Sequence, residues 1–250
     1  MKTFKDYLAP FQESFDTVDG VLNFNAPNST DSGISSKFGK GKDLKPFVKK
    51  VEGVSDLLSY SLYQAKTANA TDVMKLIKKS DMSDPNTRAF ITRSAIYGSR
   101  VLRELKVDII VTPASTSALA NAFVDELSRR TFIPIYKDSF TKRPDLTKVE
   151  IDTAHPKITP AIIKSMETTL KRAIRLGHVS IKMFAVMHRK FLRGLFEITD
   201  QKLLTKVKDK NVLIVDDVMT SGSTAKNIYD ILKTNEAETV SVLTLFKSTK

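Results

Sequence analysis

The sequence contains no cysteine and no tryptophan, and only three histidines. Without cysteine the chain can form neither disulfides nor thiolate metal sites, so nothing in its composition argues for secretion. The histidines, His155, His178 and His188, lack partner ligands at metal-binding spacing, and we assign them no role. No apolar run approaches the roughly 20 residues of a membrane helix, and the N-terminus has no apolar core typical of a signal peptide. We therefore expect a cytoplasmic protein without a membrane segment.

Positive charge, in contrast, is plentiful and unevenly distributed. The 250 residues include 40 Lys and Arg against 28 Asp and Glu, which gives a net charge of +12. Residues 137–210 hold 17 of the basic residues and 8 of the acidic ones, and therefore +9 of that total. A concentrated basic segment suits a polyphosphate or a nucleic acid, but it is also common on an ordinary solvated surface.

Hydrophobic patterning divides the chain into an N-terminal part, 1–84, and an α/β domain, 85–250, which contains the basic insertion 137–210. Residues 20–42 are rich in Asn, Ser and Gly and predict a flexible arm. From 43 to 80, apolar residues recur at helical spacing. We therefore expect the N-terminal part to be mainly helical.

The α/β domain should begin with a helix and continue as two strand–turn–helix–strand units, which predict a parallel sheet. Asp84 can cap the first helix, with Pro85 at its first position. The expected helices are 85–105, 118–130 and 225–232, and the expected strands are 107–112, 132–136, 211–215 and 239–246. Ligands of such sheets bind at the carboxyl ends of the strands, so the two hydroxyl-rich turns should meet there.

The stretch VLIVDDVMTSGST, residues 212–224, places two carboxylates at the end of an apolar strand. Backbone N–H groups in a loop that leads into a helix favour an anion, and Gly222 allows a phosphate to approach closely. The adjacent carboxylates of Asp216 and Asp217 repel each other unless hydroxyls or a cation lie between them. A ribose diol with a divalent metal nearby meets that need. The stretch therefore predicts a site for an activated sugar phosphate, with a plain strand and turn as the alternative.

This stretch also resembles the diphosphoribosyl-binding signature of the type I phosphoribosyltransferases at every position. The resemblance implies 5-phosphoribosyl 1-diphosphate as the ligand, Mg²⁺ as the cofactor and a homodimer as a common assembly. It implies that Asp216 and Asp217 act at the reaction centre, on the ribose hydroxyls. The substrate-binding residues that it implies are Thr220, Ser221, Gly222, Ser223 and Thr224 for the 5-phosphate and Ser115, Thr116, Ser117 and Lys137 for the diphosphate. For Ser115 to Ser117, a simple helix cap is the alternative.

The basic insertion is longer than a plain catalytic loop, and we expect helices at about 160–175 and 180–192 within it. Its stretch HRKFLRGLFEI, residues 188–198, is similar to the competence-associated (ComF) branch of the family. Residues 137–158 are the natural lid, with Lys142 and Arg143 as candidates to close over the diphosphate.

The resemblance implies an enzyme that transfers ribose 5-phosphate to a nitrogenous base or amine and releases diphosphate. Two alternatives remain open, because a fold fixes a ligand better than a reaction. The chain could be a non-catalytic ribose-phosphate sensor or nucleic-acid-binding protein that uses its basic insertion, or an assembly protein with a vestigial pocket. Neither the acceptor nor the metal-binding residues can be read from the sequence.

Overall fold

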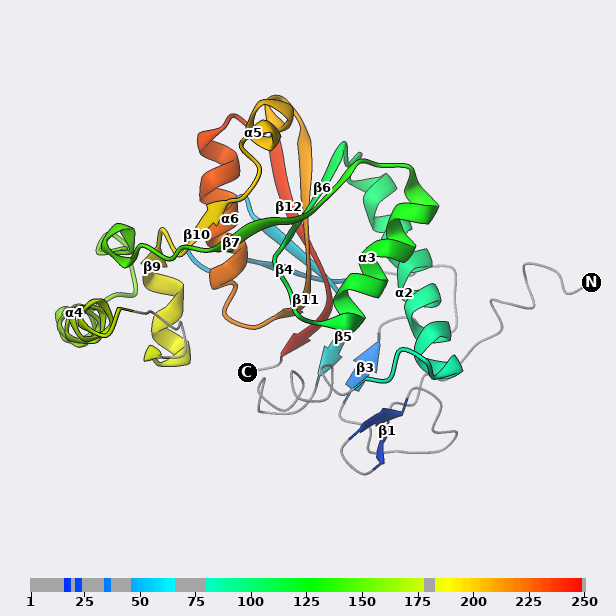
Figure 1. Cartoon of the computed structure of the whole chain (residues 1–250), viewed down its shortest axis with the longest axis horizontal. Helices are drawn as coiled ribbons and strands as arrows, with labels where there is room; N and C mark the ends of the chain where they lie inside the picture. The colour runs from blue at the N-terminus through cyan, green and yellow to red at the C-terminus, as the bar shows by residue number, and fades with distance from the viewer. Residues whose placement is uncertain are drawn as a thin grey trace, which may run out of the picture.

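The computed structural model describes residues 46–65, 80–177 and 183–248, and three short strands before them. Those strands are β1 (Asp16–Val18), β2 (Val21–Asn23) and β3 (Ile34–Ser36). Figure 1 shows a twisted central sheet with helices on both faces and a projecting arm that carries α4. This is the predicted α/β fold with a mostly parallel sheet. Within the described residues, no helix is both long and apolar enough to span a membrane.

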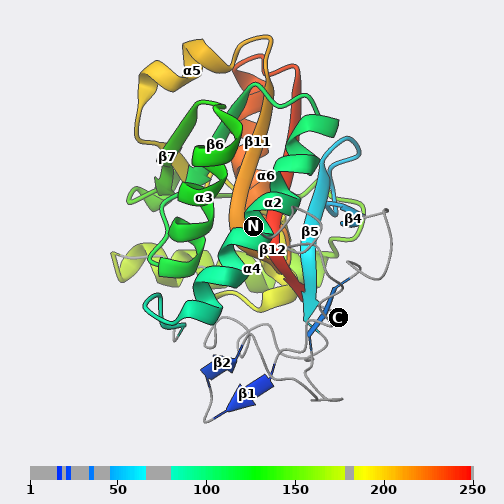
Figure 2. The same cartoon turned by 90° about the vertical axis from the view of Figure 1, so that its right-hand side faces the viewer.

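The central sheet has eight strands in the order β10-β7-β6-β11-β12-β5-β3, and β4 also pairs with β5. From β7 to β5 the strands are parallel and lie side by side in Figure 2, whereas β10, β3 and β4 run antiparallel to their neighbours. The strands after β3 are β4 (Phe47–Lys50), β5 (Leu58–Ala65), β6 (Ile109–Pro113), β7 (Ile135–Lys142), β10 (Phe196–Ile198), β11 (Asn211–Met219) and β12 (Thr239–Ser248). The parallel strands β7, β6, β11, β12 and β5 therefore have their carboxyl ends at the same edge of the sheet.

Two apolar layers cover the sheet, because successive side chains of a strand point to opposite faces. Leu213 and Val215 of β11 pack with α2 and α3, whereas Val212 and Ile214 pack with α6. The unbroken apolar run in β11 thus reflects burial on both faces. The helices are α2 (Pro85–Glu104), α3 (Ala118–Thr131), α4 (Pro160–Arg175), α5 (Gln201–Val207) and α6 (Ser223–Thr234).

Most of the helices expected in the α/β domain are confirmed. The N–H group of Thr87 donates to Asp84 Oδ2 at 2.8 Å, so Asp84 caps α2 as predicted, with Pro85 in the first turn. The helices α3, α4 and α6 lie within a few residues of their expected bounds. In the described part of 180–192, however, the chain forms the 3-10 helix η4 (Val186–Phe191) and no α-helix.

The prediction of a mainly helical N-terminal part is wrong for residues 46–65. This segment forms the hairpin of β4 and β5, and β5 extends the parallel sheet beside β12. The remaining helical candidates, at 73–77, lie outside the described residues, as does most of the expected arm at 20–42. The division of the chain at residue 84 stays a prediction, although β5 joins the same sheet as the downstream strands.

Two strands, β11 and β7, end four or more residues later than expected. The strand β11 continues through Asp216 and Asp217 to Met219, so the acidic pair lies within the sheet and not beyond it. The strand β7 begins at Ile135 instead of residue 132 and continues to Lys142. The insertion then forms η2 (Leu146–Lys148) and a small hairpin of β8 (Glu150–Ile151) and β9 (Leu192–Arg193). A flexible lid over all of 137–158 is therefore wrong.

Candidate functional site

The two hydroxyl-rich turns meet at the carboxyl edge of the sheet, as the sequence predicted, because β6 and β11 are parallel neighbours. The turn after β6 leads to Ser117, the N-cap of α3, whose Oγ accepts from the N–H of Ala120 at 3.2 Å. The neighbouring Ser117 side chain also acts to lower the pKa of the Asp217 carboxyl group. One serine thus joins the turn after β6 to the acidic pair of β11.

The surroundings of Asp216 and Asp217 raise the pKa of both carboxyl groups. Burial, and then the charge of Asp217, raises the pKa of Asp216 well above its ordinary value. Burial also raises the pKa of Asp217, although hydrogen bonds oppose this. The Asp217 N–H donates to Asp216 Oδ1 at 2.8 Å, which fixes the orientation of the Asp216 carboxylate. Among the described ion pairs none involves either carboxylate, so the pair is short of positive charge.

A divalent cation is compatible with this donor set. In the described part of the chain, no group of three or more acidic or histidine side chains is arranged to hold a metal. Magnesium, however, commonly uses one or two protein carboxylates and takes its other oxygens from water and substrate phosphates. Asp216 and Asp217 could supply the protein ligands. The donor set thus fits a metal that arrives with a phosphorylated ligand.

A pocket is lined by the loop Thr220–Thr224 and by Asp216. Ile214, Ala225 and Val242 contribute apolar side chains to its lining. The loop leads directly into the N-terminus of α6, where free N–H groups and the helix dipole favour an anion. The residues predicted to hold a phosphate therefore surround one concave site with one of the two predicted carboxylates.

Gly222 is required by both conformation and space. It lies in the left-handed region with φ of 73°, as the N-cap of α6. A Cβ atom built on it would lie 2.8 Å from Cγ1 of Val51. The adjacent Glu52 binds Lys157 at 2.8 Å and Lys190 at 3.0 Å, and these hydrogen bonds lower its pKa to about 2. The β4–β5 hairpin, from the N-terminal part, thus lies against the insertion and against the loop Thr220–Thr224, which we call the phosphate loop after its predicted ligand.

Arg189 is a pocket residue to which the sequence alone assigned no role. It comes from η4 and lines the pocket together with the phosphate loop. Its carbonyl oxygen accepts from Ser223 Oγ at 2.8 Å, and its Nε donates to the carbonyl of Phe184 at 3.1 Å. Burial lowers its pKa. The basic stretch around 188–193 was the available signal, but only the fold brings one of its residues to the pocket.

The turn predicted to hold the diphosphate has partners of its own. The N–H of Ser115 donates to Asp138 Oδ1 at 3.4 Å, and the N–H of Ser117 donates to Ser115 Oγ at 3.1 Å. Asp138 adopts a positive φ of 50°, which is uncommon outside glycine. A carboxylate therefore lies beside the turn, and a bare anion would have to compete with it.

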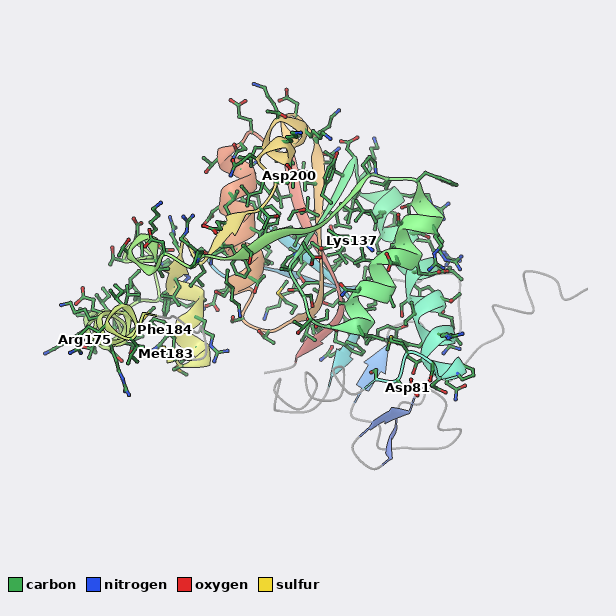
Figure 3. All side chains as sticks on the ribbon, in the orientation of Figure 1. Asp81, Lys137, Arg175, Met183, Phe184 and Asp200 are labelled. Carbon is green, nitrogen blue, oxygen red and sulfur yellow. The ribbon has the colours of Figure 1, made fainter. Side chains whose placement is uncertain are left out.

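The other predicted diphosphate ligands lie in or next to β7. Lys137, labelled in Figure 3, forms an ion pair with Asp125 of α3. The guanidinium of Arg143 donates to the carbonyl of Gly194 at 3.0 Å and lies 3.7 Å from Glu197. Arg143 thus ties the end of β7 to the connection between β9 and β10, and its role as a lid residue stays a prediction.

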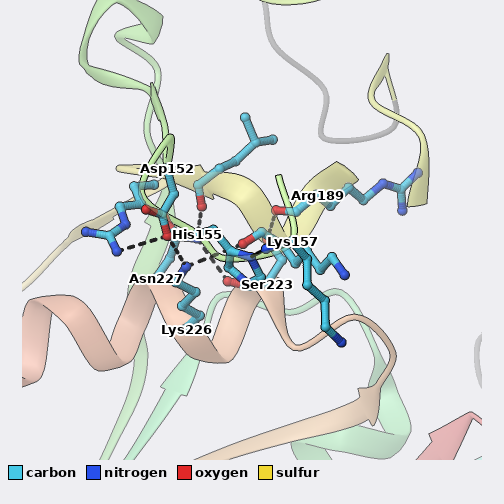
Figure 4. Close-up of polar contacts among 10 residues, drawn as sticks. Asp152, His155, Lys157, Arg189, Ser223, Lys226 and Asn227 are labelled. Atoms are coloured by element: carbon cyan, nitrogen blue, oxygen red, sulfur yellow. Dashed lines mark hydrogen bonds and ion pairs between the residues drawn. The ribbon is translucent and has the colours of Figure 1, made fainter. Parts of the chain in front are cut away.

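The insertion is bound to the first turns of α6 by a buried ion pair (Figure 4). Lys226 Nζ donates to Asp152 Oδ2 at 2.7 Å, and both side chains are at least 95% buried. Burial acts to raise the pKa of Asp152, but Lys226 and then Arg193 outweigh it, so the pKa lies below its ordinary value. Asn227 adds bonds to the carbonyl of Leu192 at 2.9 Å and to the N–H of Leu195 at 2.9 Å. The insertion is therefore held against α6, the same helix that follows the phosphate loop.

Comparison with known proteins identifies a family. The family model described as "phosphoribosyl transferase domain" matches residues 63–250. No curated protein matches the chain by sequence. Similar solved structures include a purine phosphoribosyltransferase from Pyrococcus horikoshii, with 17% identity, 63% of this chain and 82% of that chain covered, and a TM-score of 0.33. A hypoxanthine phosphoribosyltransferase from Staphylococcus aureus has 13% identity, coverages of 65% and 68%, and a TM-score of 0.37.

Proposed function

Because the chain belongs to the phosphoribosyl transferase domain family, we propose that it binds 5-phosphoribosyl 1-diphosphate and transfers the ribose 5-phosphate to a nitrogen nucleophile. The observation that carries the proposal is the pocket at Thr220–Thr224, which combines an anion-binding loop with Asp216. The loop and the N-terminus of α6 would hold the 5-phosphate. Asp216 and Asp217 would accept hydrogen bonds from the ribose hydroxyls, which relieves the repulsion between the carboxylates.

The reaction forms a bond from the acceptor nitrogen to C1 of the ribose and breaks the bond from C1 to the diphosphate oxygen. Diphosphate leaves with the electron pair, and the acceptor nitrogen loses its proton to solvent. Positive charge develops on the ribose ring as the bond breaks, as in glycoside chemistry. Asp216 and Asp217 would position the sugar and stabilise this charge without attacking it. Bound Mg²⁺ would neutralise the leaving diphosphate.

The turn at Ser115–Ser117, together with Lys137, would receive the diphosphate. The carboxylate of Asp138 beside this turn favours a metal-bound diphosphate over the bare anion, because the metal adds the positive charge that the turn lacks. The relation to the ComF branch, a homodimeric assembly and a cytoplasmic location stay predictions.

The test is calorimetric titration with 5-phosphoribosyl 1-diphosphate, with and without Mg²⁺. We expect metal-dependent binding to the wild-type protein and its loss in Asp216→Asn/Asp217→Asn. The control is Glu238→Gln, which removes an exposed carboxylate just before β12, at the opposite end of the sheet. Absence of binding to the folded wild type, or equal binding by the double variant, would refute the proposal.

A further inference from the structure

The helix α4 lies at the end of the projecting arm, beside the body that contains the sheet (Figures 1 and 3). Four of its basic side chains are exposed: Lys164, Lys171, Arg172 and Arg175. We call these four residues the α4 basic face. None of them lines the pocket at Thr220–Thr224. The α4 basic face is thus a surface separate from the proposed active site.

The cations of the α4 basic face form a line. Lys164, Lys171 and Arg175 are seven and then four residues apart, which are spacings that return to the same side of an α-helix. At ~1.5 Å of rise per residue, the three cations are separated by about 10 Å and about 6 Å along the axis. Such a row can contact successive phosphates of an extended polyanion.

In the part of the chain that the structure describes, these cations form no ion pair with an acidic side chain. Glu167 is the only acidic residue in α4, and no described ion pair involves any residue of the α4 basic face. The contrast is α3, where Arg129 and Arg130 both bind Glu126 at 2.6 Å. Among the described ion pairs, therefore, α3 neutralises its exposed cations whereas α4 takes part in none.

The opposite side of α4 is already used for packing. Met166 and Ala173 are buried, and Ile162 and Leu170 pack against the core. A helix that binds a membrane needs its apolar face free to insert among the lipids. Ile174 is the only apolar residue of α4 that ranks among the exposed large hydrophobic side chains of the described chain. The basic face is therefore suited to electrostatic contact and not to insertion.

We propose that the α4 basic face binds the sugar–phosphate backbone of a double-stranded nucleic acid without reading its sequence. Residues 160–175 contain no aromatic side chain, so α4 offers no platform for the stacked bases through which single strands are held. A row of Lys and Arg instead meets phosphates and releases their counterions. The α4 basic face is thus the part of the basic insertion 137–210 that would bind the nucleic acid. This proposal does not depend on the proposed transferase activity.

Fluorescence anisotropy with labelled duplex DNA, duplex RNA and single strands, each over a range of salt concentrations, tests the proposal. Lys171→Gln/Arg175→Gln removes two exposed cations from the α4 basic face. The matched control, Arg129→Gln/Arg130→Gln, removes two cations from α3. Since each phosphate contact contributes about 0.9 to the slope of log K against log salt for duplex DNA, we expect the α4 variant to lower that slope by about 2. The control should change it by less than about 0.5.

Three outcomes would overturn the proposal: no duplex binding by the wild type, equal effects of both variants, or a preference for single strands over duplexes. Equal effects would mean that net charge alone drives the association. The comparison between duplex DNA and duplex RNA identifies the polymer that α4 prefers. Titration of the α4 variant with 5-phosphoribosyl 1-diphosphate should match the wild type, so failure of the transferase proposal would leave this one intact.

Discussion

Replacing Gly222 by Ala should damage the phosphate loop in a way that can be separated into two parts. The first is conformational: a residue with a Cβ in the left-handed region costs about 1–2 kcal/mol. The second is steric, because the new Cβ would lie 2.8 Å from Cγ1 of Val51. Overpacking of this kind costs about 1–3 kcal/mol. The expected loss of stability is therefore about 2–5 kcal/mol.

Gly177 provides the matched control. Its φ of 67° is close to the 73° of Gly222, but a Cβ built on it meets no atom within 4 Å. Gly177→Ala should therefore show the conformational part alone, about 1–2 kcal/mol. Urea unfolding measures both losses, and titration with 5-phosphoribosyl 1-diphosphate measures the ligand affinity. We expect weaker ligand binding for Gly222→Ala and unchanged binding for Gly177→Ala.

A double-variant cycle with Val51→Ala isolates the steric part. In the Val51→Ala background, Gly222→Ala should cost about 1–3 kcal/mol less than in the wild type, because the clashing methyl group is gone. Equal costs in both backgrounds, or equal losses of stability at Gly222 and Gly177, would refute the inferred contact between the hairpin and the loop.

Two further predictions concern buried charges. Lys226→Met should lower the unfolding free energy by about 3–5 kcal/mol, because Asp152 then loses its buried partner, and Lys226→Met/Asp152→Asn should recover part of that loss in urea unfolding. Asp216→Asn should stabilise the ligand-free protein near pH 7. A carboxyl group whose pKa is raised by folding loses folded-state stability as the pH rises from its ordinary pKa of 3.8 through the raised one. Unfolding free energies near pH 5 and pH 7 should therefore differ more for the wild type than for Asp216→Asn, and an equal difference would contradict the assigned pKa direction.

The error in the N-terminal part has a specific physical cause. Ser59 and Ser61 of β5 are buried, and Ser61 Oγ lies 2.7 Å from Thr244 Oγ1 on the neighbouring β12. A buried serine is compatible with a core only when a partner satisfies its hydroxyl. Because that partner lies 183 residues away in the sequence, the alternation of β5 was not visible, and the leucines alone favoured a helix.

For the acidic pair, in contrast, the local sequence pattern correctly predicted that two turns meet at the carboxyl edge of the sheet. It did not predict where β11 ends. The apolar run before Asp216 predicted a buried strand, and the hydroxyl-rich turns predicted a common carboxyl edge. The extension of β11 beyond Asp217 was missed, because pairing of Asp216 with Thr244 and of Val218 with Phe246 depends on β12. The periodicity of apolar residues indicates which positions are buried, whereas the length of a strand depends on the strands that pair with it.

The sequence by itself determined the local units of this protein: the strand–loop–helix at 212–224, the cap at Asp84 and the excess of basic residues in 137–210. Each is encoded in contiguous residues, through periodicity, capping and composition. Tertiary structure decided which distant groups meet, including Val51 with Gly222, Asp152 with Lys226, and Arg189 with the pocket. It also decided that, among the described ion pairs, the cations of α3 have partners and those of α4 have none. Contacts between segments far apart in the chain depend on the packed sheet, and no local pattern specifies them.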